Sequence, residues 1–334
     1  MKLITTFFIL FVFLYQISFA ENPAIIILDS GRNVSLRGLS VVNDKVVWCS
    51  GSNGTVAKSV DGGKSFVWMN ITGYEKRDFR DIEAFDENNA IIMGIAEPAI
   101  ILKTSDGGKT WKKVFEDSTK GMFLDAMSFD RKGNGMVIGD PIDGKVYLAY
   151  TNDFGSSWHK DDQIFETQKG ESFFASSGTN IFVSRRGKYP LFASGGFVSR
   201  LFYKNKIYPL ALMKGMESAG ANSIAVKGNK ATIVGGNFAS DKIKDSNCVL
   251  LNLKNKVAFS VPETLPSGYR SCVVYCKKRR LVTCGTSGVD ISEDGGKNWK
   301  NISVQSFHVV QKAKAGKSLF LAGSKGKIAR IYID

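Results

Sequence analysis

The sequence predicts an all-β chain folded as a seven-bladed β-propeller, and three observations carry this prediction. An eight-residue turn motif recurs four times, seven short apolar segments each run into a glycine-rich turn, and 34 glycines stand beside 7 prolines in 334 residues. A repeat of about 45 residues is typical of propeller blades, each of which is a small antiparallel sheet. With 43% hydrophobic residues, the chain also has enough apolar side chains to bury a sizeable core.

The first 20 residues have the pattern of a secretory signal peptide. Lys2 precedes an apolar run over Leu3–Tyr15, and Ser18 and Ala20 are the small residues that a signal peptidase reads, so cleavage is expected after Ala20. The run is shorter than the roughly 20 residues that a helix needs to cross a bilayer, so we expect no membrane span. The sequence thus predicts a secreted or periplasmic protein whose residues 21–334 form one propeller domain.

The turn motif is the clearest repeat in the chain. It reads SVDGGKSF, TSDGGKTW, TNDFGSSW and SEDGGKNW, and its aspartates are 45, 47 and 141 residues apart, the last interval being three times 47. Asp and Ser side chains cap backbone amides, glycine accepts positive φ, and the final Trp or Phe packs under the turn. The motif resembles the Asp box, or bacterial neuraminidase repeat, which implies a structural role between the third and fourth strands of a blade. The aspartates concerned are Asp61, Asp106, Asp153 and Asp294.

The seven glycine turns count the blades, because they also occur where the turn motif is absent. Each follows a short apolar strand such as VVWCS, AIIMG, MVIGD, LFASG, ATIVG, LVTCG or LFLAG. The last unit ends after three strands, in KIARIYID. We therefore expect Ala24–Asp29 to pair with Ile328–Ile333 as the missing outer strand, which closes the ring and removes its exposed edges.

Charge and composition restrict the chemistry. Without Lys2 the chain has 44 basic and 31 acidic residues, a net charge of +13, which suits an acidic partner, while the predicted export argues against nucleic acid. Because His159 and His308 are the only histidines and no GxGxxG string links a strand to a helix, we expect no metal and no cofactor. The five cysteines form no disulfide framework, and Cys272 and Cys276 lie ~13 Å apart on one strand, too far to bond.

Polar side chains at the starts of the first strands form the candidate site, because these strands line the central channel of a propeller and nearby loops reach the same mouth. They can bind an anion, pair with one another as structural ion pairs, or supply the two carboxylates of a glycoside hydrolase. Asn222 and His308 start two of these strands. The predicted binding residues are Arg37, Arg80, Asp81, Asp125, Asp140, Asp143, Glu217 and Arg270. The candidate carboxylates of an enzyme are Asp81, Glu97, Asp125 and Asp140.

Over residues 24–334 the chain resembles the photosystem II stability and assembly factor-like propellers, in the type found among exported bacterial proteins. The resemblance rests on SLRGLSVV, KRDFRDIEAFD, AEPAIILKTSDGGKTW, GMFLDAMSFD, IGDPIDGKVYLAYT, MESAGANSIAV, PSGYRSCVVY and CGTSGVDISEDGGKNW. It implies a non-catalytic binding or assembly module, for which we expect a monomer and a protein or glycan partner. The alternative is a glycan-active enzyme, although the Phe/Tyr-Arg-Ile-Pro run of sialidases is missing around Arg37 and Arg80 and those enzymes have six blades.

Overall fold

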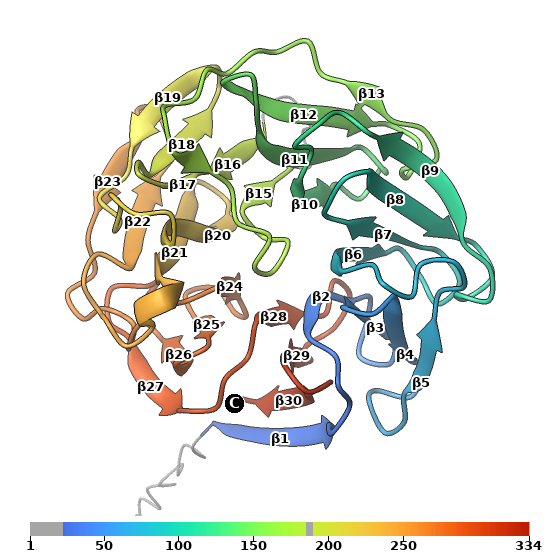
Figure 1. The fold of residues 1–334 in the computed structure, drawn as a ribbon. Helices are drawn as coiled ribbons and strands as arrows, with labels where there is room; N and C mark the ends of the chain where they lie inside the picture. Colours follow the sequence, from blue (N-terminus) through green and yellow to red (C-terminus); the bar gives the residue numbers. More distant parts are fainter. Residues whose placement is uncertain (1–22, 185–189, 334) are drawn as a thin grey trace, which may run out of the picture.

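The computed structural model describes residues 23–184 and 190–333, which form a closed ring of seven antiparallel sheets, or blades, around a central channel (Figure 1). The first strand of each blade contacts the first strands of both neighbouring blades, and the seventh contacts the first in the same way. The predicted all-β, seven-bladed propeller is therefore confirmed, whereas the predicted signal peptide lies outside the described residues. The first strands are β2 (Leu36–Val41), β6 (Phe79–Ala84), β10 (Leu124–Phe129), β15 (Ile181–Phe182), β20 (Ala219–Lys227), β24 (Cys272–Tyr275) and β28 (Val309–Lys312).

The second and third strands carry the core. Several are buried along their whole length, because each blade packs against a neighbour on both faces. This explains why their sequences are almost continuously apolar instead of alternating. The second strands are β3 (Val47–Gly51), β7 (Ala90–Gly94), β11 (Gly135–Ile142), β16 (Leu191–Ala193), β21 (Lys230–Asn237), β25 (Leu281–Gly285) and β29 (Leu319–Ala322). The third strands are β4 (Thr55–Ser59), β8 (Ala99–Thr104), β12 (Lys145–Thr151), β18 (Arg200–Tyr203), β22 (Cys248–Asn252), β26 (Gly288–Ser292) and β30 (Ile328–Tyr332).

The fourth strands form the solvent-facing rim. In the described part of the chain the only helix is the 3-10 turn η1 (Phe238–Ser240), and no helix there is long and apolar enough to cross a membrane. All five cysteines are buried and none is bonded to another. The rim strands in blades one to six are β5 (Val67–Asn70), β9 (Lys112–Asp117), β13 (His159–Lys160), β19 (Lys206–Pro209), β23 (Ala258–Ser260) and β27 (Lys300–Ser303).

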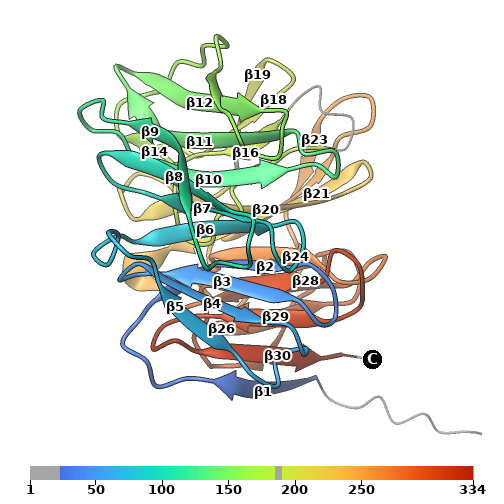
Figure 2. The ribbon, with the colours of Figure 1, turned by 90° about the vertical axis from the view of Figure 1, so that its right-hand side faces the viewer.

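In the seventh blade the rim strand comes from the other end of the chain. Strand β1 (Ala24–Asp29) runs antiparallel to β30, with Ala24 opposite Tyr332, and the edge-on view shows the two strands side by side (Figure 2). Ile25 and Leu28 pack against the core between the last and first blades. The indole of Trp68 donates a hydrogen bond of 2.8 Å to the carboxylate of Asp29, which ties β1 to the first blade as well.

The four repeated turns share one hydrogen-bond pattern. In the third blade the hydroxyl of Thr151 donates to Asp153 at 2.8 Å and accepts from the amide of Gly155, while Asp153 accepts from the amide and hydroxyl of Ser157. These bonds hold the pKa of Asp153 at about 2, although burial alone acts to raise it. The same pattern recurs around Asp61, Asp106 and Asp294.

Blade four departs from the predicted pattern. The apolar ends of FFASSGTNIFV, residues 173–183, predict one first strand, but only Ile181 and Phe182 pair with β16. Strand β14 (Glu171–Ser172) pairs instead with β17 (Gly195–Gly196), which joins blade five and gives that sheet six strands. The intervening residues Phe173–Asn180, here called the channel loop, leave the sheet and reach toward the centre of the ring (Figure 1). Small and hydroxyl-bearing side chains suit this path, because they bond to other blades instead of filling a sheet face.

The contacts of β1 predict a large effect of truncation. A chain that starts at Asn33 lacks the ladder to β30, the packing of Ile25 and Leu28 and the bond to Trp68, so we expect a loss of about 3 kcal/mol or more. The melting temperature, measured by circular dichroism, should fall by at least about 5 °C. A chain that starts at Pro23 keeps β1 and is the control. Equal melting temperatures for the two chains would contradict the importance of this closure.

The capped turns predict a pH-dependent contribution to stability. Because Asp153 ionises more readily in the folded chain, its contribution is present above pH ~4 and is lost as the pH falls toward 2. Asp153→Ala should therefore cost about 1 kcal/mol at pH 7 and much less at pH 2, as measured by urea unfolding. The exposed Asp162 allows a matched control, Asp162→Ala, which should change little at either pH. A constant difference between Asp153→Ala and the parent at both pH values would contradict the capping role.

Candidate functional site

The channel loop divides the channel into two mouths. It is held by hydrogen bonds of 2.7 Å from Ser176 to Asn222, from Ser177 to the carbonyl of Ser271 and from Thr179 to Ser223. Gly178 sits at positive φ, and a Cβ atom there would lie 2.2 Å from the Asp81 carboxyl carbon. The two ends of the channel are therefore separate cavities of about 420 and 730 Å³. We call the smaller one the arginine mouth, lined by Arg37, Arg80, Asp140, Tyr269 and His308 among others, and the larger one the lysine mouth, lined by Asp81, Glu83, Thr179, Lys312 and Lys314 among others.

Two arginines dominate the arginine mouth. Arg37 comes from β2 and donates to the carbonyl of Ser176 at 3.2 Å, and Arg80 comes from β6 and pairs with Asp78 at 2.8 Å. Burial and the positive charge of Arg80 lower the pKa of Arg37. Among the described residues, Arg37 has no carboxylate at ion-pair distance. Its cation therefore faces the cavity without a neutralising charge.

Of the titratable groups around these arginines, His308 carries no charge at physiological pH, whereas Asp140 is ionised above about pH 6. Burial and the nearby Arg37 lower the pKa of His308 to about 4, so its ring is neutral at physiological pH. Burial raises the pKa of Asp140 to about 6, although its Oδ1 accepts a 2.9 Å bond from the amide of Phe173. Burial and the proximity of Asp140 raise the pKa of Asp125 well above its usual value, and neither of its carboxyl oxygens accepts a hydrogen bond of normal geometry. Both effects favour the protonated form of Asp125.

Aromatic rings complete the wall of the arginine mouth. Phe238 lies 6.0 Å from Phe174 and 6.3 Å from Tyr269, in edge-to-face arrangements. The hydroxyl of Tyr269 donates to Asn222 at 2.9 Å, which fixes the ring beneath the mouth. Cationic guanidinium groups beside apolar ring faces are suited to a ligand with a carboxylate on an apolar or flat body.

The structure places two predicted binding residues elsewhere. Asp81 does not share the arginine mouth; it lines the lysine mouth, where its carboxylate accepts 2.8 Å bonds from the amides of Ile82 and Met127. Arg270 is fully buried and forms a 2.5 Å ion pair with Asp290. Side chains alternate along an extended chain, so when Tyr269 and Ser271 face the channel, Arg270 faces the interior of its own blade.

Three further predicted residues lie at exposed turns that line neither of the two mouths. Glu97 accepts a 3.0 Å bond from the amide of Gly121, Asp143 occupies the tip of the turn between β11 and β12, and Glu217 precedes β20. Of the predicted residues, the structure brings together Arg37, Arg80 and Asp140, with Asp125 behind them and His308 beside them. No group of three or more possible metal ligands occurs among the described residues.

Sequence reasoning missed the channel loop, Tyr269 and Phe238. The signal for Tyr269 was present, because alternation within GYRSC requires Tyr269 and Ser271 to share a face that excludes Arg270. Phe238 follows a strand in a loop that has no counterpart in the other blades, so no periodic pattern marks it. The channel loop differs from a strand only in the small residues of ASSG.

Neither a protein-family model nor a curated protein sequence matches this chain. Solved structures do match. A structure of YCF48 bound to D1 peptide has 16% sequence identity and a TM-score of 0.66, over 94% of this chain and 98% of that one. YCF48 from Cyanidioschyzon merolae has 15% identity and a TM-score of 0.65, over 92% and 99%. The Pan2 WD40 domain of Neurospora crassa has 15% identity and a TM-score of 0.61, over 93% and 95%.

The partly buried carboxyl of Asp140 predicts a stability that falls as the pH rises, which is the opposite of the dependence predicted for Asp153. The pKa of this carboxyl is about 6 in the folded chain and lower in the unfolded chain, so the folded chain holds the proton more tightly. The parent therefore loses stability as the pH rises from about 4 through 6. Asp140→Asn should remove this loss and be about 1–3 kcal/mol more stable than the parent at pH 8, with little difference at pH 4. Urea unfolding at both pH values measures this. Asp143→Asn, on an exposed turn, is the control; a similar gain there would contradict the assignment to Asp140.

The likeness to these structures lies below 25% identity and shows the fold. The two YCF48 structures fit the family resemblance seen in the sequence, and all three neighbours are matched over almost their whole length. This chain is therefore a seven-bladed β-propeller with the fold of YCF48 and of WD40 domains.

Proposed function

We propose that this protein is an exported, non-catalytic binding or assembly module whose arginine mouth receives a carboxylate-bearing segment of its partner. The observation that carries the proposal is the pair of arginines in one recess, where the carbonyl of Ser176 is the only hydrogen-bond acceptor of Arg37 within the described part of the chain. A ligand carboxylate between Arg37 and Arg80 would relieve the repulsion between the two cations and accept charge-assisted hydrogen bonds from both. Burial disfavours a negative charge on Asp125, which lies behind the same recess.

A propeller of the same fold supports a protein as the partner. One of the matching structures is YCF48 bound to D1 peptide, so this fold presents a surface on which a peptide docks. In this chain the aromatic wall formed by Phe174, Phe238 and Tyr269 would contact the body of the bound segment. An acidic glycan carries the same carboxylate chemistry and is the second source of ligand that the test below must separate.

The location and the structural motifs belong to the same proposal. We propose that the protein is secreted or periplasmic, that it is cleaved after Ala20, and that residues 21–334 act as one monomeric domain. The four capped turns around Asp61, Asp106, Asp153 and Asp294 then act as Asp boxes with a purely local, structural role, and β1 acts as the closure of the ring. None of these turns lines either mouth through its aspartate.

The alternative function is a glycan-active enzyme that uses Asp125 and Asp140. The specific observation in its favour is that both carboxyls have raised pKa values, as the general acid of a glycosidase requires. Such an enzyme also needs an ionised carboxylate as nucleophile or base. Asp140 is ionised above about pH 6, but Asp125 is fully buried and Asp81 opens to the other mouth, so no second candidate carboxyl among the described residues reaches a ligand in the arginine mouth. The binding function is therefore better supported.

Substitution of the arginines tests the proposed function. Arrays of acidic peptides and of sialylated and uronic-acid glycans identify a ligand, and isothermal titration calorimetry measures its affinity. Arg37→Ala and Arg80→Ala should each weaken binding roughly 10- to 100-fold, since each removes a charge-assisted contact. Amidation of the ligand carboxylate should have a comparable effect, whereas Lys214→Ala, at an exposed lysine outside both mouths, is the control. Release of a product from any glycan, lost in both Asp125→Asn and Asp140→Asn, would defeat the non-catalytic function.

A further inference from the structure

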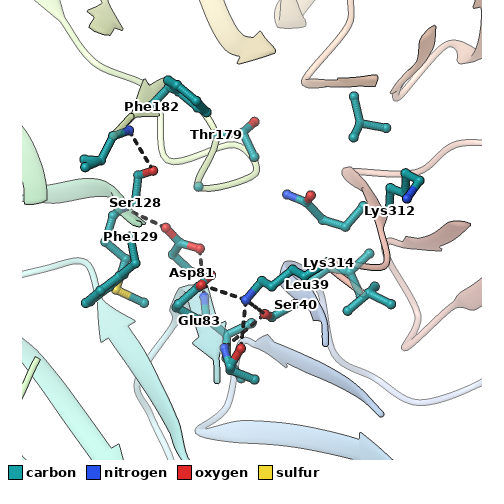
Figure 3. Close-up of a pocket in the computed structure, with 18 of the residues that line it drawn as sticks. Leu39, Ser40, Asp81, Glu83, Ser128, Phe129, Thr179, Phe182, Lys312 and Lys314 are labelled. Atoms are coloured by element: carbon teal, nitrogen blue, oxygen red, sulfur yellow. Dashed lines mark hydrogen bonds and ion pairs between the residues drawn. The ribbon is translucent and has the colours of Figure 1, made fainter. Parts of the chain in front are cut away.

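The lysine mouth is a second recess that the proposed function does not use. Its cavity of about 730 Å³ opens where the first strands end, on the opposite side of the channel loop from Arg37 and Arg80. Gly178 and Thr179 contribute to its floor, and Figure 3 shows Thr179 and Phe182 on one side of it and Lys312 and Lys314 on the other. A ligand in this cavity cannot touch the arginine mouth, because the hydrogen-bonded channel loop lies between them.

The wall of this cavity is largely apolar. Phe129, Phe182, Val226 and Val274 line it and are all half-buried, so part of each side chain is open to the cavity. Phe154 adds a ring that is 40% exposed. Apolar surface that stays accessible within a recess favours an apolar ligand group, because its entry would remove both surfaces from water.

The turns around this cavity are strongly basic on one side. In blades five, six and seven the turns from the first to the second strand read KGNK over residues 227–230, KKRR over 277–280 and KAKAGK over 312–317, without an acidic residue. We call six of these side chains the basic rim: Lys227, Lys230, Lys277, Lys278, Lys312 and Lys314. All except Lys312 belong to exposed residues. A cluster of positive charge therefore lies beside the lysine mouth.

Little of this positive charge is neutralised. Lys314 pairs with Glu83 at 2.6 Å, but Lys312 donates to the carbonyl of Gly316 and Lys227 to the carbonyl of Lys277, which carry no net charge. The corresponding turns of blades one to three carry carboxylates, and each of these accepts hydrogen bonds from backbone amides. The donors are the amides of Lys317 and Ser318 for Asp44, of Asn88 and Asn89 for Asp86, and of Lys132 and Asn134 for Asp130.

We propose that the lysine mouth is a docking site for an acidic peptide segment that places one apolar side chain in the cavity and its carboxylates on the basic rim. The apolar side chain of this ligand matches the apolar wall of the cavity, and its carboxylates match the basic rim. A membrane surface would require apolar side chains that project from the face, and here they are recessed. A sulfated polysaccharide would satisfy the lysines but would leave the apolar wall exposed to water.

Fluorescence anisotropy with two labelled peptides tests this proposal. The first is a hexapeptide of Glu residues with Leu at its third position, and the second has Ser in place of Leu. At about 50 mM salt the Leu peptide should bind at least about fivefold more tightly than the Ser peptide, since burial of a Leu side chain is worth ~1.5–3 kcal/mol when complete. Both peptides should bind more weakly at 500 mM salt, because the rim acts through charge.

Two variants locate the site. Lys277→Glu/Lys278→Glu reverses two exposed charges of the basic rim and should weaken both peptides at least about tenfold. Val226→Trp fills the cavity and should abolish the preference for Leu while it leaves the salt dependence intact. Lys214→Glu/Lys242→Glu makes the same charge change at exposed lysines outside both mouths and should alter binding less than about twofold, and melting temperatures confirm that each variant is folded.

Three results would overturn the proposal. These are equal binding of the Leu and Ser peptides, an equal loss in the rim variant and in Lys214→Glu/Lys242→Glu, and a preference for heparin or for phosphatidylserine vesicles over the Leu peptide. Retention of the preference in a folded Val226→Trp variant would also count against it, because the apolar side chain would then bind elsewhere.

Discussion

The hydrogen bonds that hold the channel loop determine what this propeller can bind. An open channel would join the ends of seven first strands into one polar tube. Here Ser176, Ser177 and Thr179 bond to side chains and carbonyls of blades five and six, and Arg37 bonds to the loop from blade one. One segment of blade four thus cross-links distant blades and makes a floor for two unlike cavities. Most of its side chains are buried, so these polar groups must be satisfied within the protein.

The two cavities differ in the way their charge is held. In the arginine mouth the cations are partly buried, and burial keeps His308 uncharged at physiological pH and disfavours a charge on Asp125, so the field there is produced by few groups with fixed positions. In the lysine mouth the cations are long, exposed side chains around an apolar recess, and salt screens them readily. The first arrangement suits selection of one carboxylate, and the second suits attraction of a flexible acidic chain.

The repetition in the sequence was sufficient to predict the blades, because each glycine turn and each capped aspartate reports a local structure that the backbone must adopt. The contents of the channel were harder to predict for a physical reason. Alternation within GYRSC places Tyr269 and Ser271 on one face and Arg270 on the other, but it does not define which of the two faces lines the channel. Asp81 adjoins Arg80 in sequence, yet Arg80 lines the arginine mouth and Asp81 lines the lysine mouth. The pairing of β6 with β7 shifts its register between Phe79 and Asp81, and no periodic pattern in the sequence predicts that shift. The channel loop takes the place of an expected strand. Its residues form hydrogen bonds with other blades instead of the backbone ladder of a sheet.

The pairing of β1 with β30 also sets the order of events while the protein is being made. Among the described strands, the one that completes the seventh blade is synthesised first and its partner last, about 300 residues later, which takes ~15–60 s at ordinary rates of translation. Throughout that time the backbone groups of AIIILD lack the strand with which they pair, although the first blade is already present. A chain of this topology therefore completes its folding after its C-terminal strand has emerged, and its first segment needs protection from pairing with other chains until then.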